Sequence, residues 1–485
     1  MGVSLNPSTI LSGQGIDVAS LVQQILTNQS TGPLSVWQGQ ETSLSTQNGL
    51  LAGIENNLTN LQTAVAALSD PAGALTAQDA TSSQPAVLTA TADSTAIAGT
   101  HTVEVSNLAT IGTLYTNAIP AGANISFLAS GQTTGDIQLQ VGGASGATRD
   151  ITVTQGSNDT LSTLANYINT QSTANNWGVS ASVVSDTTGS RLALQSQNTG
   201  ATGALAVSSN TNTNLTFATP AGGTNASLTV DGVPFSSTTN TVTGAIQGVT
   251  LNLDSQSPDN PVQLSVGPDQ NQITTAVNNF VSAYNTVITT NNQQYAVDPT
   301  GTTPAPPLES DLSLRSVQSS ILADAGFAIT GNSGYVNLES LGINTNNDGT
   351  LTLGTNAKGL SFTQILAANP SAVVNFFQNA SGTGFANTFN TDLGNLTNPT
   401  SGPLNAEITQ NSSEQQDLTT TINNFEVRLT AQQTQLTAQF DAVNASLQAY
   451  PLLLQEVTQT LGTLGQGTSS SGSLIASGPT LTQGL

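Results

Sequence analysis

Residues 418–447 read LTTTINNFEVRLTAQQTQLTAQFDAVNASL, and their apolar residues recur at intervals of three, four and seven. The recurring residues are Leu418, Ile422, Phe425, Leu429, Leu436, Phe440, Val443 and Leu447. Because an α-helix turns once every 3.6 residues, this spacing puts them all on one helical face. Each Leu or Ile taken out of water stabilises a protein by about 1.5 to 3 kcal/mol, so the face needs a partner that covers it.

The N-terminal part of the chain contains a second face of the same kind. Its apolar residues are Leu34, Trp37, Leu44, Leu51, Ile54, Leu58, Leu61, Val65 and Leu68. Heptad spacing at both ends predicts that the two helices pair with each other in a coiled-coil leg. The periodicity also fits an alternative, in which two unrelated helices each pack on their own local domain.

Prolines set the expected limits of these helices. A short amphipathic helix is predicted over 16–26, and the segment 29–33 is expected to break it. The apolar residues of this short helix are Leu21, Val22, Ile25 and Leu26. A long helix is predicted over 34–68, and it ends before Pro71 because proline cannot continue the hydrogen-bond ladder. The C-terminal helix is expected to end near Pro451 for the same reason.

Between the two ends the apolar period changes from 3.6 to about 2, which is typical of β-strands. Residues 228–235 predict a hairpin, because Asp231-Gly232 separates two alternating stretches. A short helix is expected over 161–168, behind Asp159 and Thr160 as candidate caps. The chain is therefore predicted to be α+β, with strand-rich domains inserted between terminal helices.

Charge is the abnormal feature of the composition. Of 485 residues only 7% are charged, and the formal net charge is -23. The cations are Arg149, Arg191, Arg315, Arg428 and Lys358. Five dispersed cations cannot form the basic stripe that neutralises phosphates, so nucleic acids and anionic lipids are not expected partners. No apolar run approaches the roughly 18 residues of a membrane span, so no membrane insertion is expected.

The sequence predicts no catalytic, cofactor or metal site. It contains no cysteine, which excludes disulfides, thiolate ligands and a cysteine nucleophile. His101 is the only histidine and shares strand parity with Val103, and no local pattern marks a Ser or carboxylate partner for general-base chemistry. Residues 344–349 vaguely resemble a calcium loop, but Thr355 stands where a bidentate Glu is required.

Several short motifs follow one another along the chain. The opening carries Ser12-Gly13, Ile16-Asp17, Leu21-Val22, Ile25-Leu26 and Gly32-Pro33-Leu34. The middle carries Thr160-Leu161, Leu164-Ala165, Ile168-Asn169, Gly178-Val179, Arg191-Leu192 and Thr199-Gly200, which resemble a flagellin-hook insertion motif. Later come Leu341-Gly342-Ile343, Asp348-Gly349-Thr350-Leu351, Ala367-Ala368-Asn369-Pro370 and Phe376-Phe377. In this order the motifs resemble the FliD family of flagellar filament-capping, hook-associated proteins. The family's helices usually carry many more cations, so no salt bridge of a relative is transferred to this chain.

The resemblance implies a non-enzymatic, extracellular protein that caps the distal tip of the bacterial flagellar filament. Such a cap promotes ordered polymerisation of exported flagellin and prevents its loss. The implied partners are further copies of this chain in a small ring, flagellin, the hook-filament junction protein and an export chaperone, with no cofactor. The implied export route is flagellar type III secretion without a cleaved signal peptide.

The expected fold is an elongated multidomain α+β protein with a helical leg and β-rich head domains. Terminal helical segments are expected over 1–45 and 446–485, and a helical leg domain over 46–75 and 268–445. A β-rich head domain is expected over 76–129 and 211–267, with an inserted β-rich domain over 130–210. The residues predicted to serve helix pairing and assembly are Leu21, Val22, Ile25, Leu26, Leu44, Leu51, Leu58, Leu61, Leu418, Ile422, Phe425, Leu429, Leu436, Phe440 and Leu447.

Three other functions are weighed against the cap. A flagellin or junction protein also pairs terminal helices, and long filaments of the purified chain would identify one. A surface adhesin would bind host or mucin glycans through the head domains, and saturable glycan binding by residues 76–267 would identify it. An enzyme would show turnover that His101→Ala abolishes.

Overall fold

The computed structural model describes residues 17–120, 122–219 and 221–466. The expectations for residues 1–16 and for the tail from 467 to 485 lie outside these residues. The chain divides into two compact units, which are described separately below. The helical unit comprises 1–59, 287–320 and 393–485, and the mixed unit comprises 60–286 and 321–392. Long helices and small antiparallel sheets confirm the predicted α+β class.

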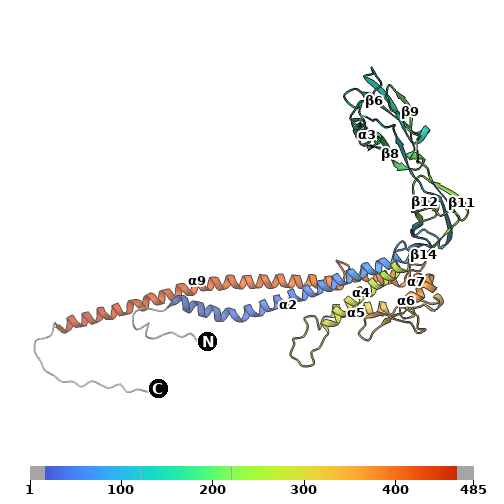
Figure 1. Cartoon of the computed structure of the whole chain (residues 1–485). Helices are drawn as coiled ribbons and strands as arrows, with labels where there is room; N and C mark the ends of the chain where they lie inside the picture. The colour runs from blue at the N-terminus through green and yellow to red at the C-terminus, as the bar shows by residue number, and fades with distance from the viewer. Residues whose placement is uncertain (1–16, 121, 220, 467–485) are drawn as a thin grey trace, which may run out of the picture. The chain divides into compact units, whose positions relative to one another are not determined.

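Two long helices dominate the helical unit. Helix α2 spans Val18–Ser69 and belongs to this unit up to residue 59, and helix α9 spans Pro403–Gln466. They lie side by side in Figure 1. The unit also contains the end of α4 (Gln270–Gln294) and most of α5 (Leu312–Ala325).

Both long helices continue through a proline, so two of the predicted boundaries are wrong. Helix α2 contains Pro33 and joins the segments that the sequence predicted as separate helices. Helix α9 contains Pro451 and continues to Gln466. An internal proline removes one hydrogen bond, whereas ending a helix leaves four backbone groups without partners at each new terminus. In α2 the Thr31 hydroxyl also donates to the Thr27 carbonyl, 2.6 Å away, just before the proline.

The first β domain of the mixed unit is built from two separate stretches of sequence, and we call it the split β domain. One sheet has the order β1 (Gln78–Ser82), β14 (Val262–Pro268), β3 (Gly99–Asn107), β10 (Ala226–Val230) and β11 (Val233–Ser237). The other sheet has the order β12 (Thr241–Ile246), β13 (Val249–Leu253) and β2 (Leu88–Ala92). Both sheets contribute to one core that includes Val103, Leu228 and Leu251. The predicted Asp231-Gly232 hairpin is present, and both turn residues have positive φ, as a type I′ turn requires.

The second domain, the inserted β domain, interrupts the first. One sheet has the order β4 (Ile111–Tyr115), β8 (Gly189–Thr199) and β7 (Val179–Asp186). The other has the order β6 (Ala147–Thr154), β5 (Thr134–Val141) and β9 (Leu205–Thr211). Helix α3 (Leu161–Asn175) begins at the predicted cap Thr160, whose hydroxyl accepts a hydrogen bond from the Thr163 amide. The core of this domain includes Leu114 and Leu215, which lie outside the expected range 130–210.

The remaining helices of the mixed unit surround a cluster of aromatic rings. The elements are α6 (Phe362–Ala368), α7 (Pro370–Phe377), α8 (Phe385–Leu396, in this unit up to residue 392) and the hairpin β15 (Ile343–Thr345) and β16 (Leu351–Leu353). Short 3₁₀ turns are η1 (Ala74–Thr76), η2 (Gly143–Ser145), η3 (Ala201–Gly203), η4 (Asn332–Gly334) and η5 (Glu339–Leu341). Phe376 stacks on Phe385 with 5.5 Å between the ring centroids, and Phe280 contacts Phe385 edge-on. These three side chains are fully buried and form the centre of the helical core.

Candidate functional site: the paired terminal helices

The order of the contacts between α2 and α9 shows the relative direction of the two helices. At one end the rings of Trp37 and Phe425 meet, and further along the Asn48 amide donates to the Ser412 hydroxyl, 3.3 Å away. Still further along, the Asn405 amide donates to the Glu55 carboxylate. Since the residue numbers rise on α2 while they fall on α9, the helices are antiparallel.

Apolar side chains near these polar contacts are buried. Leu51 and Ile54 lie between Asn48 and Glu55 on α2, and both are almost completely buried. Leu58 and Leu404 are also fully buried in the helical unit. These apolar positions of the heptad pattern are therefore buried inside the helical unit, beside the polar contacts that join α2 to α9.

The polar contacts fix the register of the pair. The Thr419 hydroxyl donates to Glu41 Oε1 at 3.0 Å, and Gln415 Nε2 donates to the Glu41 backbone carbonyl at 3.3 Å. A shift of one helical turn moves each donor about 5.4 Å along the axis and breaks these bonds. The polar side chains therefore select one alignment among those that a regular apolar face permits.

The carboxyl group of Glu55 has a perturbed pKa. Burial raises its pKa, because the charged form loses hydration, and the hydrogen bond from Asn405 opposes part of that effect. Its second oxygen is buried without a partner among the described residues. The hydrogen bond between Glu55 and Asn405 of α9 therefore forms at the expense of the hydration of the Glu55 carboxylate.

The predicted interaction residues fall into two groups by exposure. Those that are buried are Leu21, Val22, Leu51, Leu58, Leu61 and Ile422. Those that are half-buried are Ile25, Leu26, Leu44, Leu418, Phe425, Leu429, Leu436, Phe440 and Leu447. Leu61 belongs to the mixed unit. The half-buried residues keep apolar surface that is available to other chains.

Several residues of the pair were not identified from the sequence. Glu41, Asn48, Asn405 and Ser412 are polar, and nothing in a hydrophobic period marks a polar residue that faces a partner helix. The partner of His101 was also missed, because Asp231 accepts its hydrogen bond from 130 positions later in the chain. Paired strands, and not local spacing, bring these two residues together.

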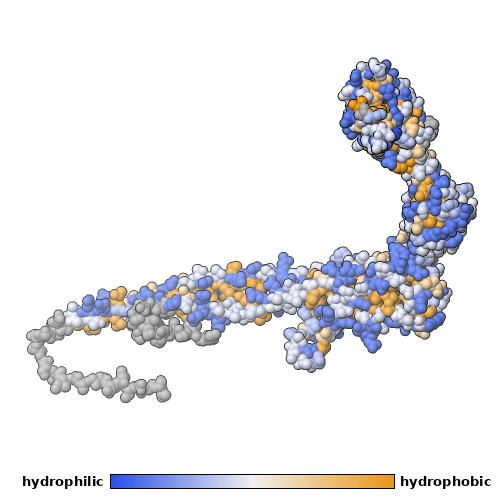
Figure 2. Space-filling view, viewed as in Figure 1, coloured by the Kyte–Doolittle hydropathy of each residue, from blue (hydrophilic) through white to orange (hydrophobic). Residues whose placement is uncertain are grey.

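Beyond the last cross-helix contacts, the end of α9 presents apolar side chains to solvent. The exposed residues are Tyr450, Leu452, Leu453, Leu454, Val457 and Leu461, each more than half exposed. We call this set the α9 end surface. In Figure 2 apolar residues reach the visible surface of α9 near its C-terminal end. Six exposed apolar side chains within twelve residues form an unusual surface for a monomer.

Among residues 17–466, leaving out 121 and 220, no three His, Asp or Glu side chains gather in a way that could hold a metal ion. The same residues include no helix with both the length and the apolar character that crossing a bilayer requires.

Comparison with known proteins finds matches along most of the chain. The family model described as flagellar hook-associated protein 2 N-terminus matches residues 14–111, and the model of its C-terminus matches residues 223–450. The B-type flagellar hook-associated protein 2 of Pseudomonas aeruginosa is 28% identical over 477 residues, which cover 93% of this chain and 97% of that protein. The A-type flagellar hook-associated protein 2 of Pseudomonas aeruginosa is 25% identical over 376 residues, which cover 71% of this chain and 76% of that protein. The crystal structure of the D1-D2-D3 domains of the flagellar cap protein FliD from Escherichia coli matches with a TM-score of 0.56 and 26% identity, over 75% of this chain and 99% of that chain.

Proposed function

Because the chain belongs to the family of flagellar hook-associated protein 2, the FliD cap proteins, we propose that it caps the distal tip of the bacterial flagellar filament. At the tip it promotes ordered polymerisation of exported flagellin and prevents the loss of flagellin to the medium. The observation that carries the proposal is the likeness to the Escherichia coli cap protein over 75% of this chain. The family is one of structural flagellar proteins, so the proposed role is mechanical and not catalytic.

The cap works as a small ring of identical chains. The α9 end surface supports the formation of a ring. Its six apolar side chains are exposed, and covering them with another chain stabilises the assembly. The half-buried face that includes Leu436, Phe440 and Leu447 continues toward this surface along α9. Both surfaces are therefore candidates for contacts between copies, and for contacts with flagellin and the hook-filament junction protein.

Export of the chain uses the flagellar type III route, with a chaperone that covers the terminal apolar faces until the chain leaves the cell. The sequence supports this step in two ways. The absence of cysteine leaves no disulfide that would prevent an unfolded chain from passing through a narrow channel. The helical ends can also fold when they dock, and they lose their conformational entropy at that moment.

A deletion strain tests the proposed function. A strain that lacks this chain is expected to release unpolymerised flagellin into the medium, and the full-length chain supplied on a plasmid is expected to restore filaments. A chain carrying Leu452→Gln, Leu453→Gln and Leu454→Gln is expected to fail in this complementation. The matched control is Val297→Gln, which changes a residue that is 76% exposed on a loop, and it is expected to restore filaments. Filaments of normal length in the deletion strain would contradict the proposal.

Electron microscopy of the purified chain separates a cap from another axial protein. A cap is expected to form small closed rings or stacked plates, whereas a flagellin or junction protein extends into long filaments. Long filaments would therefore replace the proposed function with that alternative.

A further inference from the structure

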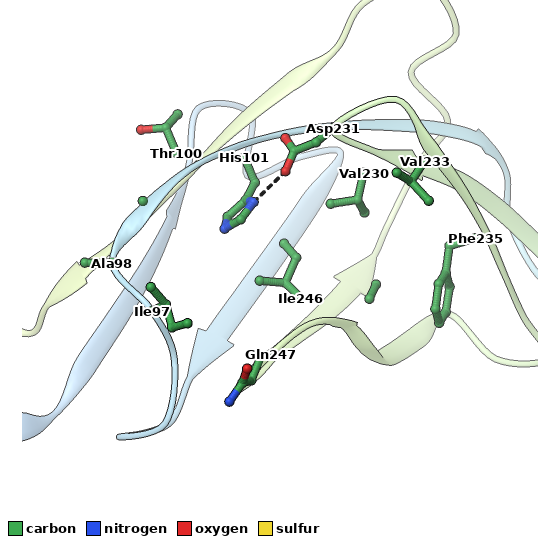
Figure 3. A pocket seen from close by; sticks show the side chains of 12 residues that line it. Ile97, Ala98, Thr100, His101, Val230, Asp231, Val233, Phe235, Ile246 and Gln247 are labelled. Carbon is green, nitrogen blue, oxygen red and sulfur yellow. Dashed lines mark hydrogen bonds and ion pairs between the residues drawn. The ribbon is translucent and has the colours of Figure 1, made fainter.

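The split β domain contains a pocket to which the proposed function assigns no role. The pocket has a volume of about 520 Å³ and lies between the start of β3, the β10–β11 hairpin and the end of β12. Its apolar lining includes Ile97, Val230, Val233, Phe235 and Ile246 (Figure 3). Pockets that bind small organic molecules usually have about 300 to 1,000 Å³ and a mostly apolar lining with a few polar groups.

One polar pair stands in this apolar lining. His101 Nδ1 lies 2.8 Å from Asp231 Oδ2, and the other carboxylate oxygen, Oδ1, accepts a hydrogen bond from the Thr102 amide at 2.8 Å. In Figure 3 the imidazole ring extends from β3 toward Ile97 and Ile246, and the dashed line joins it to Asp231. The pair therefore holds the imidazole ring in a fixed orientation at the pocket.

The hydrogen bonds define what the free imidazole nitrogen can do. The bonds from His101 and from the Thr102 amide lower the pKa of Asp231, so its carboxylate is ionised near neutral pH and can only accept hydrogen bonds. In a neutral imidazole the proton must then be on Nδ1, where it is donated to Asp231. The other nitrogen, Nε2, is left as a hydrogen-bond acceptor.

His101 lines the pocket, and its side chain is 24% exposed. A Cβ atom added to Gly99 would lie 4.0 Å from Nε2, at an ordinary contact distance, so glycine at this position leaves that place beside the nitrogen empty. The described residues that line the pocket include no Lys or Arg, and Asp231 carries a negative charge. A carboxylate ligand is therefore disfavoured, and a neutral ligand with a hydrogen-bond donor fits the lining best.

We propose that this pocket binds a small aromatic molecule with a hydroxyl group, a phenol being the simplest type. The apolar side chains, Phe235 among them, cover the ring, and His101 Nε2 accepts the hydrogen bond of the hydroxyl. His101 is thus a binding residue, and Asp231 is a positioning residue that sets the tautomer.

The single histidine makes the test direct, because the imidazole signals in an NMR spectrum of the full chain all come from His101. The full chain is titrated with 4-ethylphenol and, separately, with 4-ethylanisole, which has the same shape but lacks the hydroxyl donor. The phenol is expected to shift the imidazole signals and to bind about five- to tenfold more tightly than the ether, as expected for one hydrogen bond. Equal affinities, or imidazole signals that neither compound moves, would overturn the proposal.

Three variants test the assigned roles. His101→Phe keeps an aromatic ring but removes the acceptor, so the affinities for phenol and ether are expected to become equal. Asp231→Asn suits the left-handed turn position, where φ is 51°, and its amide can donate to Nδ1. The proton then moves to Nε2, which the imidazole ¹⁵N shifts report, and the preference for the phenol is expected to disappear. Ile97→Asn removes an exposed apolar side chain from the lining and is expected to weaken both compounds.

The control variant is Val184→Asn, which changes an exposed apolar residue of β7 in the inserted β domain. It is expected to leave both affinities unchanged. A phenol preference that survives both His101→Phe and Asp231→Asn would show that the hydroxyl is bound elsewhere and would overturn the assignment to His101.

Discussion

The indole ring of Trp37 lies edge-on to the phenyl ring of Phe425, with 5.2 Å between the ring centroids and 83° between the ring planes. The guanidinium carbon of Arg428, one turn further along α9, lies 5.5 Å from the centroid of the same phenyl ring. Trp37 and Phe425 are separated by almost the whole chain, so this contact reports directly on whether its two ends are paired.

Removal of the Phe425 ring is expected to expose Trp37. The chain has two tryptophans, and a Trp177→Phe background leaves Trp37 as the only source of tryptophan fluorescence. In that background Phe425→Ala is expected to shift the Trp37 emission to longer wavelength and to lower the stability of the pair by about 1 kcal/mol, a typical value for one aromatic contact. An emission maximum that does not move would contradict the contact.

Truncation of Leu51 is expected to destabilise the helical unit strongly. Leu51 is completely buried, and Leu→Ala substitutions at such positions cost about 2 to 5 kcal/mol. The matched control is Leu453→Ala, because Leu453 is 56% exposed and its truncation is expected to change stability by less than about 0.5 kcal/mol. Urea unfolding followed by Trp37 emission measures both. Equal midpoints for the two variants would show that Leu51 does not belong to the core of the helical unit.

The mixed unit is expected to lose stability as the pH rises toward 7. Burial, together with the nearby carboxyl of Asp392, raises the pKa of Asp324 to about 7. A carboxyl group whose pKa is raised on folding contributes its full stability below the unfolded value near 4, and this contribution disappears as the pH rises through 7. Asp324→Asn removes the titration, and we expect it to stabilise the protein at pH 8 by about 2 kcal/mol relative to its effect at pH 4. Thermal unfolding at both pH values measures this, and an effect that is the same at both would contradict the perturbed pair.

Self-association is expected to depend strongly on salt. Each chain carries a net charge of -23, so copies that approach one another repel at low ionic strength. Raising the salt concentration from about 0.05 M to about 0.5 M shortens the screening length from roughly 14 Å to 4 Å and should shift the chain toward rings. Analytical ultracentrifugation measures the distribution, with Leu453→Gln as a variant whose association is expected to remain weak at both salt concentrations. Association that decreases with salt would indicate that attraction between charges, and not apolar contact, holds the copies together.

The sequence predicted the leg well because heptad spacing is a property of one helix alone. It did not predict the register, because the bonds from Asn48 to Ser412 and from Thr419 to Glu41 join polar residues that have no periodic signal. The prediction that α2 is divided at Pro33 was wrong. Sequence rules treat a proline as the end of a helix, whereas a long helix that buries apolar residues tolerates one proline. The same error placed the end of the C-terminal helix at Pro451.

The split and inserted β domains show a second limit of prediction from the sequence. The Asp231-Gly232 turn was predictable because its chemistry lies in two adjacent residues. The His101–Asp231 pair was not, because it depends on which strands become neighbours in the sheet. The boundary of the inserted domain depends on the same information, and from the positions of Leu114 and Leu215 in its core we propose that this domain extends from about 111 to 217.

Disulfide trapping tests the antiparallel pairing of the two ends most directly, because the chain has no cysteine of its own. The Asn48 amide donates to the Ser412 hydroxyl at 3.3 Å, so Asn48→Cys combined with Ser412→Cys is predicted to form a disulfide within one chain under mild oxidation. The control combines Asn48→Cys with Thr434→Cys, which lies 22 residues, or about 33 Å, further along α9 and is predicted to remain reduced. Cross-linking of the 48–434 pair, or failure of the 48–412 pair to cross-link within one chain, would contradict the pairing on which this account depends.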